Sequence, residues 1–515
     1  MGSGKTTVGR RLAERLRVEF VDVDAQIEAA VGCTIAEYWR REGEEAFREA
    51  ERSASREFLL GPPRVIALGG GAVVDRQTRH LAAGRSLLVT LRAGIETLAS
   101  RLSNDTNRPK IAVRSGDLPG RVAQLMADRA AAYAECHLSI GTDDLSVDDV
   151  VDRICLLIDR DPLLVPLGER SYAIDIGADC APRLTDALRA IKPTSLVIVS
   201  DSNVKRAQRA GIALATRAVD VPVVEVTLAA GEEHKSLASV AAIWDAALGA
   251  NVDRKSVVVA FGGGVVGDLA GFAASTLLRG VRCVQVPTSL LAMVDSSVGG
   301  KTGFDHPVGK NLVGAFHHPS AVVIDLEYLK TLPARERIAG LAEVVKVALV
   351  LDAQLFEMLE KKAERVAAGG ETTLLEPIVR RAVSAKIGVV RDDEREQGVR
   401  GLLNFGHTVG HALEAYGGYT RYKHGEAVAI GMVAEMAAAV RLGLAPKSLV
   451  EQTRTVLERC GLPTHVEPKE LRAAWAFVSS DKKRDGATLN LPIVGAVGEG
   501  RIERIEMNRF RDALL

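Results

Sequence analysis

The chain has 515 residues, a length that suggests roughly three domains. Its 66 Lys and Arg residues balance 66 Asp and Glu residues, so the zero formal net charge gives no reason to expect nucleic acid or an anionic membrane as a partner. No C-x-x-C pair, signal-peptide core or apolar run of the ~20 residues that span a membrane is present. We therefore expect a cytoplasmic α/β protein with reduced cysteines.

The sequence opens MGSGKTTVGR, where Gly4-Lys5-Thr6 and the helical run behind them match the end of a phosphate-binding loop. Backbone N–H groups at such a helix start favour phosphate, the lysine reaches the β- and γ-phosphates, and the threonine hydroxyl binds Mg²⁺. The full pattern has a further glycine and a hydrophobic strand in front. We therefore expect Met1 to be an internal methionine and the first strand of this domain to be missing from the sequence as given.

Helix and strand patterns alternate up to about residue 160, where Pro162 and Pro166 indicate a boundary. A short strand at 19–24 is expected to end in Asp22 and Asp24, which alternation would place on one face of the strand. The other elements expected are helices at 35–59 and 146–158 and strands beginning at 64 and 86.

These segments, followed by GEEAFREAE (43–51), LGGGAV (68–73) and SNDTNRPKIAVRSG (103–116), resemble shikimate kinase in their order. The resemblance implies a P-loop kinase domain at 1–160 that uses ATP with Mg²⁺. The residues that it implies for shikimate are Asp24, Arg48, Gly70, Gly71 and Arg129, with the two arginines on the carboxylate. Those that it implies for the nucleotide are Gly2, Gly4, Lys5, Thr6 and Thr7, with Thr6 and Asp22 at the Mg²⁺. Asp24 would also help to activate the attacking hydroxyl, and Arg108 in a lid would stabilise the transferring phosphoryl group; the family commonly has Pro-Leu after that arginine, whereas Pro109-Lys110 follow it here.

Residues 161–332 contain strand-like runs separated by helix-length segments, which predicts a parallel sheet. Within this block, FGGGVVGDLAGFAAST (261–276) reads as strand, glycines and helix, an order typical of a dinucleotide pyrophosphate site, although a structural glycine turn has the same composition. The segment 286–311, VPTSLLAMVDSSVGGKTGFDHPVGKN, reads as loop-rich. Its lysines and the upstream Arg279 suggest an anionic small substrate, with a solvated loop as the alternative.

Residues 333–515 are mainly helical by period. Glu343 and Lys346 share one face of an apolar helix, a placement that needs a reason. His407 and His411 are four residues apart, and His424 follows. Histidines and a glutamate in one domain predict a zinc (or cobalt) site, and from spacing alone His407 and His411 are the natural chelating pair.

In family order, PTSLLAMVDSSVGGKTG, GLAEVVKVALV, NFGHTVGHALEA and HGEAVAIGM resemble 3-dehydroquinate synthase over about residues 165–500. The resemblance implies an α/β NAD-binding domain and a helical metal- and substrate-binding domain. It replaces the spacing-based pair with Glu343, His407 and His424 as metal ligands and gives His411 a substrate or proton-transfer role. The catalytic residues that it implies are Asp295, Lys301, Lys346, Lys386 and Arg400. The substrate residues are Arg279, Lys310, Asn311, Glu396, Asn404 and Lys482 (or Lys483). The dinucleotide residues are Asp201, Asn203, Glu232, Lys235, Gly263, Gly264, Val265, Asp268, Thr288, Ser289 and Thr331.

The implied reaction converts 3-deoxy-arabino-heptulosonate 7-phosphate to 3-dehydroquinate and phosphate. A hydroxyl is oxidised by NAD⁺, phosphate is eliminated, the ketone is reduced again, and ring opening with aldol closure follows, so that NAD⁺ is regenerated. Both halves would serve the shikimate pathway of aromatic amino-acid biosynthesis, and a homodimer is expected. The alternatives are an active synthase with an inactive kinase half, and a metal- and NAD-dependent polyol dehydrogenase in residues 165–515.

Overall fold

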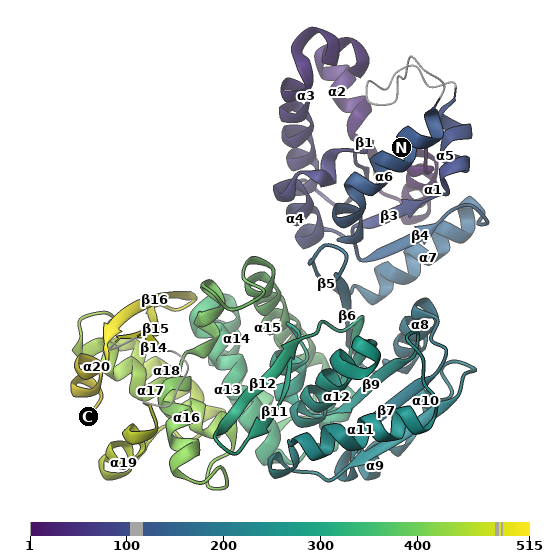
Figure 1. Cartoon of the computed structure of the whole chain (residues 1–515). Coiled ribbons are helices and arrows are strands. Elements are labelled where there is room, and N and C mark those ends of the chain that lie inside the picture. Colours follow the sequence, from purple (N-terminus) through teal and green to yellow (C-terminus); the bar gives the residue numbers. More distant parts are fainter. Residues whose placement is uncertain (1, 104–116, 479–483, 486–487) are drawn as a thin grey trace. The chain divides into compact units, whose positions relative to one another are not determined.

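A computed structural model describes residues 2–103, 117–478, 484–485 and 488–515. It divides into two compact units, Met1–Ile174 and Asp175–Leu515 (Figure 1). The division falls after the boundary expected at residue 160, because the residues that follow 160 still contact the first unit. The N–H of Gly168, for example, donates to Glu135 at 2.9 Å. Within the described ranges, no helix has both the length and the apolar character that a membrane crossing requires.

The first unit has two parallel strand pairs, β1–β2 and β3–β4, so that β2 and β3 each pair with one described strand. Val8 and Leu12 of the first helix pack with Ile140 and with apolar residues of the last helix, Val150 and Ile154 among them. The elements are α1 (Lys5–Leu16), β1 (Glu19–Asp22), α2 (Val23–Val31), α3 (Ile35–Leu60), β2 (Arg64–Ala67), α4 (Arg76–Arg85), β3 (Val89–Arg92), α5 (Ile95–Leu102), α6 (Leu118–Ala134), β4 (Leu138–Gly141) and α7 (Val147–Arg160).

The strand expected at 19–24 is shorter than predicted. It ends at Asp22, whose extended backbone makes it the N-cap of α2, and Asp24 lies in the first turn of that helix. The prediction that both carboxylates end one strand and share its face is therefore wrong.

A seven-stranded sheet has the strand order β5-β6-β13-β10-β9-β7-β8; β5 and the first residues of β6 precede Asp175, and the other strands belong to the second unit. The pairs β10–β13, β10–β9, β9–β7 and β7–β8 are parallel. Such strands are covered on both faces and read as continuous apolar runs, which is why the sequence predicted them. The elements are β5 (Leu163–Val165), β6 (Tyr172–Gly177), α8 (Ala181–Ile191), β7 (Leu196–Asp201), α9 (Ser202–Ala207), α10 (Arg209–Thr216), β8 (Val223–Leu228), α11 (Leu237–Gly249), β9 (Val257–Gly262), α12 (Gly264–Thr276), β10 (Arg282–Pro287) and β13 (Ala321–Asp325).

The stretch expected to be loop-rich is ordered instead. A π-helical turn spans Ala292–Ser296, and β11 (Lys301–His306) pairs antiparallel with β12 (Gly309–Phe316). Gly303 and Gly314 lie opposite each other, so close that a Cβ on either would meet the partner strand's carbonyl oxygen at 2.4 or 2.1 Å. Glycines of this kind make a strand look like a loop in the sequence.

The remaining part is helical, as predicted, with a small sheet near the C-terminus that the sequence did not reveal. Its first helix is buried on every side from Ala339 to Val350, as expected of a central helix. The elements are α13 (Ala334–Leu351), α14 (Ala353–Ala368), α15 (Thr372–Asp392), α16 (His407–Tyr416), α17 (His424–Arg441), α18 (Ser448–Arg459), α19 (Pro468–Val478), β14 (Arg484–Asp485), β15 (Thr488–Ala496), β16 (Glu499–Glu506) and α20 (Met507–Leu514).

Candidate active sites

Side chains from three helices meet in the helical part of the second unit. Glu343 is 1% exposed in α13, and His407 and His424 are the first residues of α16 and α17. The Nε2 atoms of both histidines lie 3.6 Å from Oε1 of Glu343. That oxygen is buried and has no hydrogen-bond partner among the described residues. A divalent cation between the three donors would supply that partner, and two histidines with one carboxylate are typical of catalytic zinc.

The other ring nitrogen of each histidine, Nδ1, is fixed by a hydrogen bond. Nδ1 of His407 lies 3.1 Å from the carbonyl oxygen of Phe405, and Nδ1 of His424 lies 3.2 Å from Glu414 Oε2. These bonds turn both Nε2 atoms towards Glu343. Burial lowers the pKa of His424, but Glu414 and Glu343 outweigh it and raise that pKa to about 10. His411 is exposed, and its ring lies beside that of His407 with the ring centroids 5.2 Å apart. The donor atoms of His411, however, group with those of Glu414 and His424 and not with those of Glu343 and His407.

Two ion pairs adjoin this cluster. Lys346 is paired with Glu343, and Lys386 of α15 is paired with Asp295 in the π-helical turn, a backbone feature frequent at functional sites. Burial lowers the pKa of Lys386 to about 8, and the positive charges of Arg400 and Lys346 act in the same direction. Lys386 and Lys346 outweigh the effect of burial on Asp295 and hold its pKa below the usual range.

Two expected substrate residues, Glu396 and Asn404, and the expected catalytic residue Lys301 are joined by hydrogen bonds and an ion pair. Glu396, in left-handed backbone, is paired with Lys301 through one oxygen and accepts from Asn404 Nδ2 at 2.8 Å through the other. Arg400 is 2% exposed and donates to the carbonyl oxygens of Gly299, at 3.1 Å, and Glu394.

The hairpin β11–β12 brings Lys310 and Asn311 towards the expected dinucleotide residues. Lys310 Nζ lies 3.4 Å from both Glu232 and Glu414. Lys235 is buried, 2.7 Å from Asp268 and 2.6 Å from Asn311 Oδ1. Asp268, Glu232 and Asp305 raise the pKa of Lys235 although burial lowers it.

The other expected dinucleotide residues follow the carboxyl ends of the adjacent parallel strands β7, β9 and β10. Asp201 ends β7 and caps α9, Gly263 follows β9 and precedes α12, and Thr288 follows β10. Ligands of open α/β sheets bind at this edge. Val265 lies in the first turn of α12, and the hydroxyl of Ser289 accepts from the N–H of Ala292. The remaining expected residues of this region are Asn203 in α9, Gly264 at the start of α12 and Thr331 bonded to Gln208. Arg279 differs, because it precedes the amino end of β10, where it is exposed in left-handed backbone.

The first unit has a cavity of about 360 Å³ lined by Arg48, Gly71 and Arg129, three residues expected to bind shikimate. Arg129 donates to the carbonyl oxygen of Gly70, and Tyr133 donates to the same oxygen at 2.6 Å. Asp24 lies beside the neighbouring glycine turn, where a Cβ on Gly69 would meet its Oδ1 at 2.7 Å.

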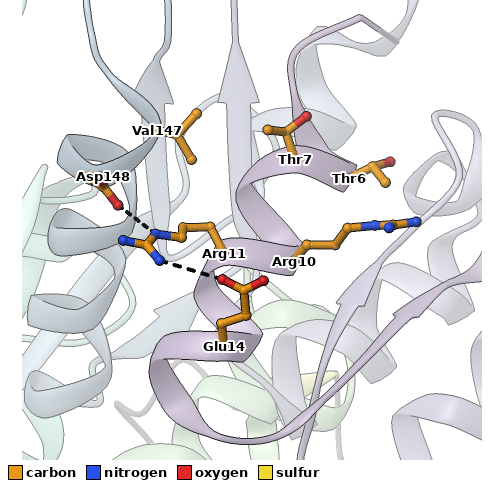
Figure 2. Close-up of a pocket in the computed structure, with 7 residues that line it drawn as sticks. All are labelled: Thr6, Thr7, Arg10, Arg11, Glu14, Val147 and Asp148. Carbon is orange, nitrogen blue, oxygen red and sulfur yellow. Dashed lines mark hydrogen bonds and ion pairs between the residues drawn. The ribbon is translucent and has the colours of Figure 1, made fainter.

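A second cavity of about 570 Å³ lies beside the start of α1 (Figure 2). Thr6 and Thr7 line it, and Thr6 Oγ1 donates to Asp22 Oδ2 at 2.8 Å, so the two expected Mg²⁺ ligands are adjacent. Gly4 caps α1 in left-handed backbone, and the carbonyl oxygen of Gly2 accepts from Arg101. Figure 2 shows Arg11 between Glu14 and Asp148, at 3.5 and 2.8 Å.

Two expected residues, Arg108 and Lys482, lie outside the described residues. Conversely, sequence reasoning missed Glu51, which is 3% exposed and pairs with Arg48, and Glu414. It also missed Glu435, which accepts from the backbone N–H groups of Gly406 and Val409. A signal existed for Glu435, because it is the sole charged residue in the apolar run 427–440.

Family models match most of the chain. The shikimate kinase model matches residues 1–159, the 3-dehydroquinate synthase N-terminal model residues 225–339 and the C-terminal model residues 340–484. The 3-dehydroquinate synthase of Thermosynechococcus vestitus is 43% identical over 357 residues, 68% of this chain and 97% of that protein. That of Symbiobacterium thermophilum is 47% identical over 324 residues, 62% of this chain and 89% of that protein.

Two solved structures resemble the same part of the chain. A 2-epi-5-epi-valiolone synthase from Streptomyces hygroscopicus with NAD⁺ and Zn²⁺ is 30% identical, covers 68% of this chain and 97% of its own, and has a TM-score of 0.61. A 2-deoxy-scyllo-inosose synthase with carbaglucose-6-phosphate, NAD⁺ and Co²⁺ is 25% identical, covers 68% of this chain and 99% of its own, and has a TM-score of 0.62. Together with the donor cluster, these findings show that the chain belongs to the 3-dehydroquinate synthase family and carries a shikimate kinase domain before the synthase.

Proposed function

We propose that the second unit converts 3-deoxy-arabino-heptulosonate 7-phosphate to 3-dehydroquinate and phosphate, and that the first unit phosphorylates shikimate with ATP. The observation that carries the synthase proposal is the buried cluster of Glu343, His407 and His424, which lies beside the Asp295–Lys386 pair. The kinase proposal rests on the adjacent Thr6 and Asp22 and on the cavity lined by Arg48 and Arg129.

In this proposal Glu343, His407 and His424 hold Zn²⁺ or Co²⁺. The bound ion supplies Lewis-acid polarisation of the hydroxyl and ketone oxygens of the substrate. NAD⁺ lies at the carboxyl edge of β7, β9 and β10, with its pyrophosphate at the start of α12. The two similar structures, which hold NAD⁺ together with Zn²⁺ or Co²⁺, support both assignments.

The chain's own residues bind and orient the substrate. The cationic and amide side chains around the cluster surround the phosphate, carboxylate and hydroxyls of the substrate: Lys301, Lys310, Asn311, Lys346, Lys386, Arg400 and Asn404. Arg279 is assigned to the phosphate by the family resemblance alone. Glu396 holds Lys301 and Asn404 in place. His411 is exposed on the same helix as His407, so its ring can exchange protons with the substrate.

In the kinase half, Lys5 contacts the ATP phosphates, Thr6 and Asp22 hold Mg²⁺, and Arg48 with Arg129 binds the shikimate carboxylate. We further propose a cytoplasmic homodimer. The exposed apolar side chains of Val308, Leu312 and Phe316 on the β11–β12 hairpin support an interface there.

The test is a parallel assay of both activities on the full chain. The synthase proposal expects phosphate release from the heptulosonate phosphate without net NADH. Net NADH from simple polyols with no phosphate release would instead indicate a dehydrogenase. The kinase proposal expects shikimate-dependent consumption of ATP, and its absence while the synthase turns over would leave only the synthase active.

A further inference from the structure

The two helices that carry the histidine ligands hold each other in place. His407 is the first residue of α16 and His424 is the first residue of α17, so both ligands lie where a helix begins. A helix start is the part most prone to fray, because its first N–H groups have no partner within the helix. A metal site built from two helix starts therefore needs support from outside each helix.

That support is reciprocal. Glu414 lies on α16 and accepts at 3.2 Å from Nδ1 of His424, the first residue of α17. Glu435 lies on α17 and accepts the backbone N–H groups of Gly406 and Val409, both at 2.9 Å, at the start of α16. Gly406 is the N-cap of α16 and has no side chain to cap it, so Glu435 takes over this role from the facing helix.

Both carboxylates are deeply buried. Glu414 is 3% exposed and Glu435 is 2% exposed. Besides His424, Glu414 has a second partner, because Lys310 Nζ lies 3.4 Å from its Oε1. A buried carboxyl group is costly unless its oxygens have hydrogen-bond partners, so both are expected to act on these partners rather than on solvent.

We propose that Glu414 and Glu435 are positioning residues that form a reciprocal brace between α16 and α17 and thereby set the affinity of the metal site. Glu414 fixes the ring orientation and raises the basicity of His424, whereas Glu435 fixes the backbone from which His407 projects. This proposal rests on the proposed function, because it takes Glu343, His407 and His424 as the ligands. Loss of such an outer partner typically weakens metal binding by about 10- to 100-fold.

The experiment measures the binding of Zn²⁺ and Co²⁺ to the full-length apo chain by competition with a chromogenic chelator, and records the visible spectrum of the Co²⁺ form. The variants are Glu414→Gln and Glu435→Gln, which keep shape and remove charge. Glu470→Gln is the matched control: Glu470 is also buried in this unit but accepts from Arg421 and Tyr422, at 2.9 and 3.1 Å. Thermal unfolding of each variant shows that it is folded.

We expect both brace variants to bind metal at least about 10-fold more weakly, with a shifted Co²⁺ spectrum, and Glu470→Gln to match the wild type. Unchanged affinities and spectra in a folded Glu414→Gln or Glu435→Gln overturn the brace, even if the wild type releases phosphate. If the wild type binds metal and the variants weaken it, but no phosphate is released from the heptulosonate phosphate, the brace stands and the proposed function fails. A wild type that binds neither ion overturns the brace.

Discussion

The substitution Gly431→Ala tests whether the separation of α16 and α17 controls the metal cluster. Gly431 lies on α17, one turn before Glu435, and faces the start of α16. A Cβ there would lie 2.0 Å from the carbonyl oxygen of Gly406 and 2.9 Å from the backbone nitrogen of Gly410. Real Cβ atoms essentially never come within 3.0 Å of another heavy atom, so the start of α16 must move away by about 1 Å.

The expected cost follows from that displacement. Overpacking of this kind destabilises a protein by about 1–3 kcal/mol, and here the clashing atoms are backbone, which cannot rotate away. The same movement stretches the bonds from Gly406 and Val409 to Glu435 and shifts His407. A misplacement of about 1 Å in an active site can reduce turnover about 100-fold, and we expect a loss of that size in phosphate release.

Gly388→Ala is the matched control. Gly388 lies inside α15, and a Cβ there would meet nothing within 4 Å, so the change should stabilise the chain by about 0.5–1 kcal/mol through helix propensity. The assays are thermal unfolding, Co²⁺ titration and phosphate release on both variants. If Gly431→Ala unfolds at the same temperature as Gly388→Ala and binds metal as the wild type does, the reasoning about the helix separation is refuted.

Three further outcomes are expected. Chelation should abolish phosphate release, and added Zn²⁺ or Co²⁺ should restore it, whereas added Mg²⁺ should restore only the kinase reaction. Phosphate release that persists in chelator would contradict the metal assignment. Burial favours the neutral form of Lys386 and lowers its pKa to about 8, so its positive charge is present below that pH and lost above it. The kcat/KM for the heptulosonate phosphate should therefore fall as pH rises through about 8, and Lys386→Met should lack this fall. Lys5→Met should reduce shikimate phosphorylation by about 100-fold or more and leave phosphate release unchanged, and equal kinase rates in the two proteins would remove Lys5 from the phosphate site.

Structural features that depend on residues close together in the chain could be predicted from the sequence. The apolar runs 196–199 and 257–261 predicted buried parallel strands, and Gly263 marked the turn into α12. The β11–β12 hairpin was not readable, because its strands carry glycines where the two backbones approach closely. Asp24 was assigned to a strand face because alternation continues past Asp22, whereas the backbone turns into a helix at that residue.

The metal cluster likewise contains residues that a sequence pattern indicates and a residue that only tertiary packing brings into place. The histidines stand out because histidines beside glycines are conspicuous, but spacing alone favoured His411 over His424 as the partner of His407. Glu343 joins the cluster because α13 is buried on every side and crosses the starts of both histidine helices, a fact of tertiary packing that a sequence pattern does not contain.

The brace shows why outer contacts are harder to predict than ligands. Glu435 contacts backbone atoms 29 and 26 residues earlier in the chain, and any well-placed carboxylate could do so, hence no motif records the contact. The sequence does show the unusual residues that such a contact requires. These are a charged residue in an apolar helix and glycines in the facing helix that let the two helices approach closely. Charge in an apolar run together with glycine in the facing helix is therefore a readable sign that one helix caps the other. In this chain that sign points to the residues that hold His407, and not only to His407 itself.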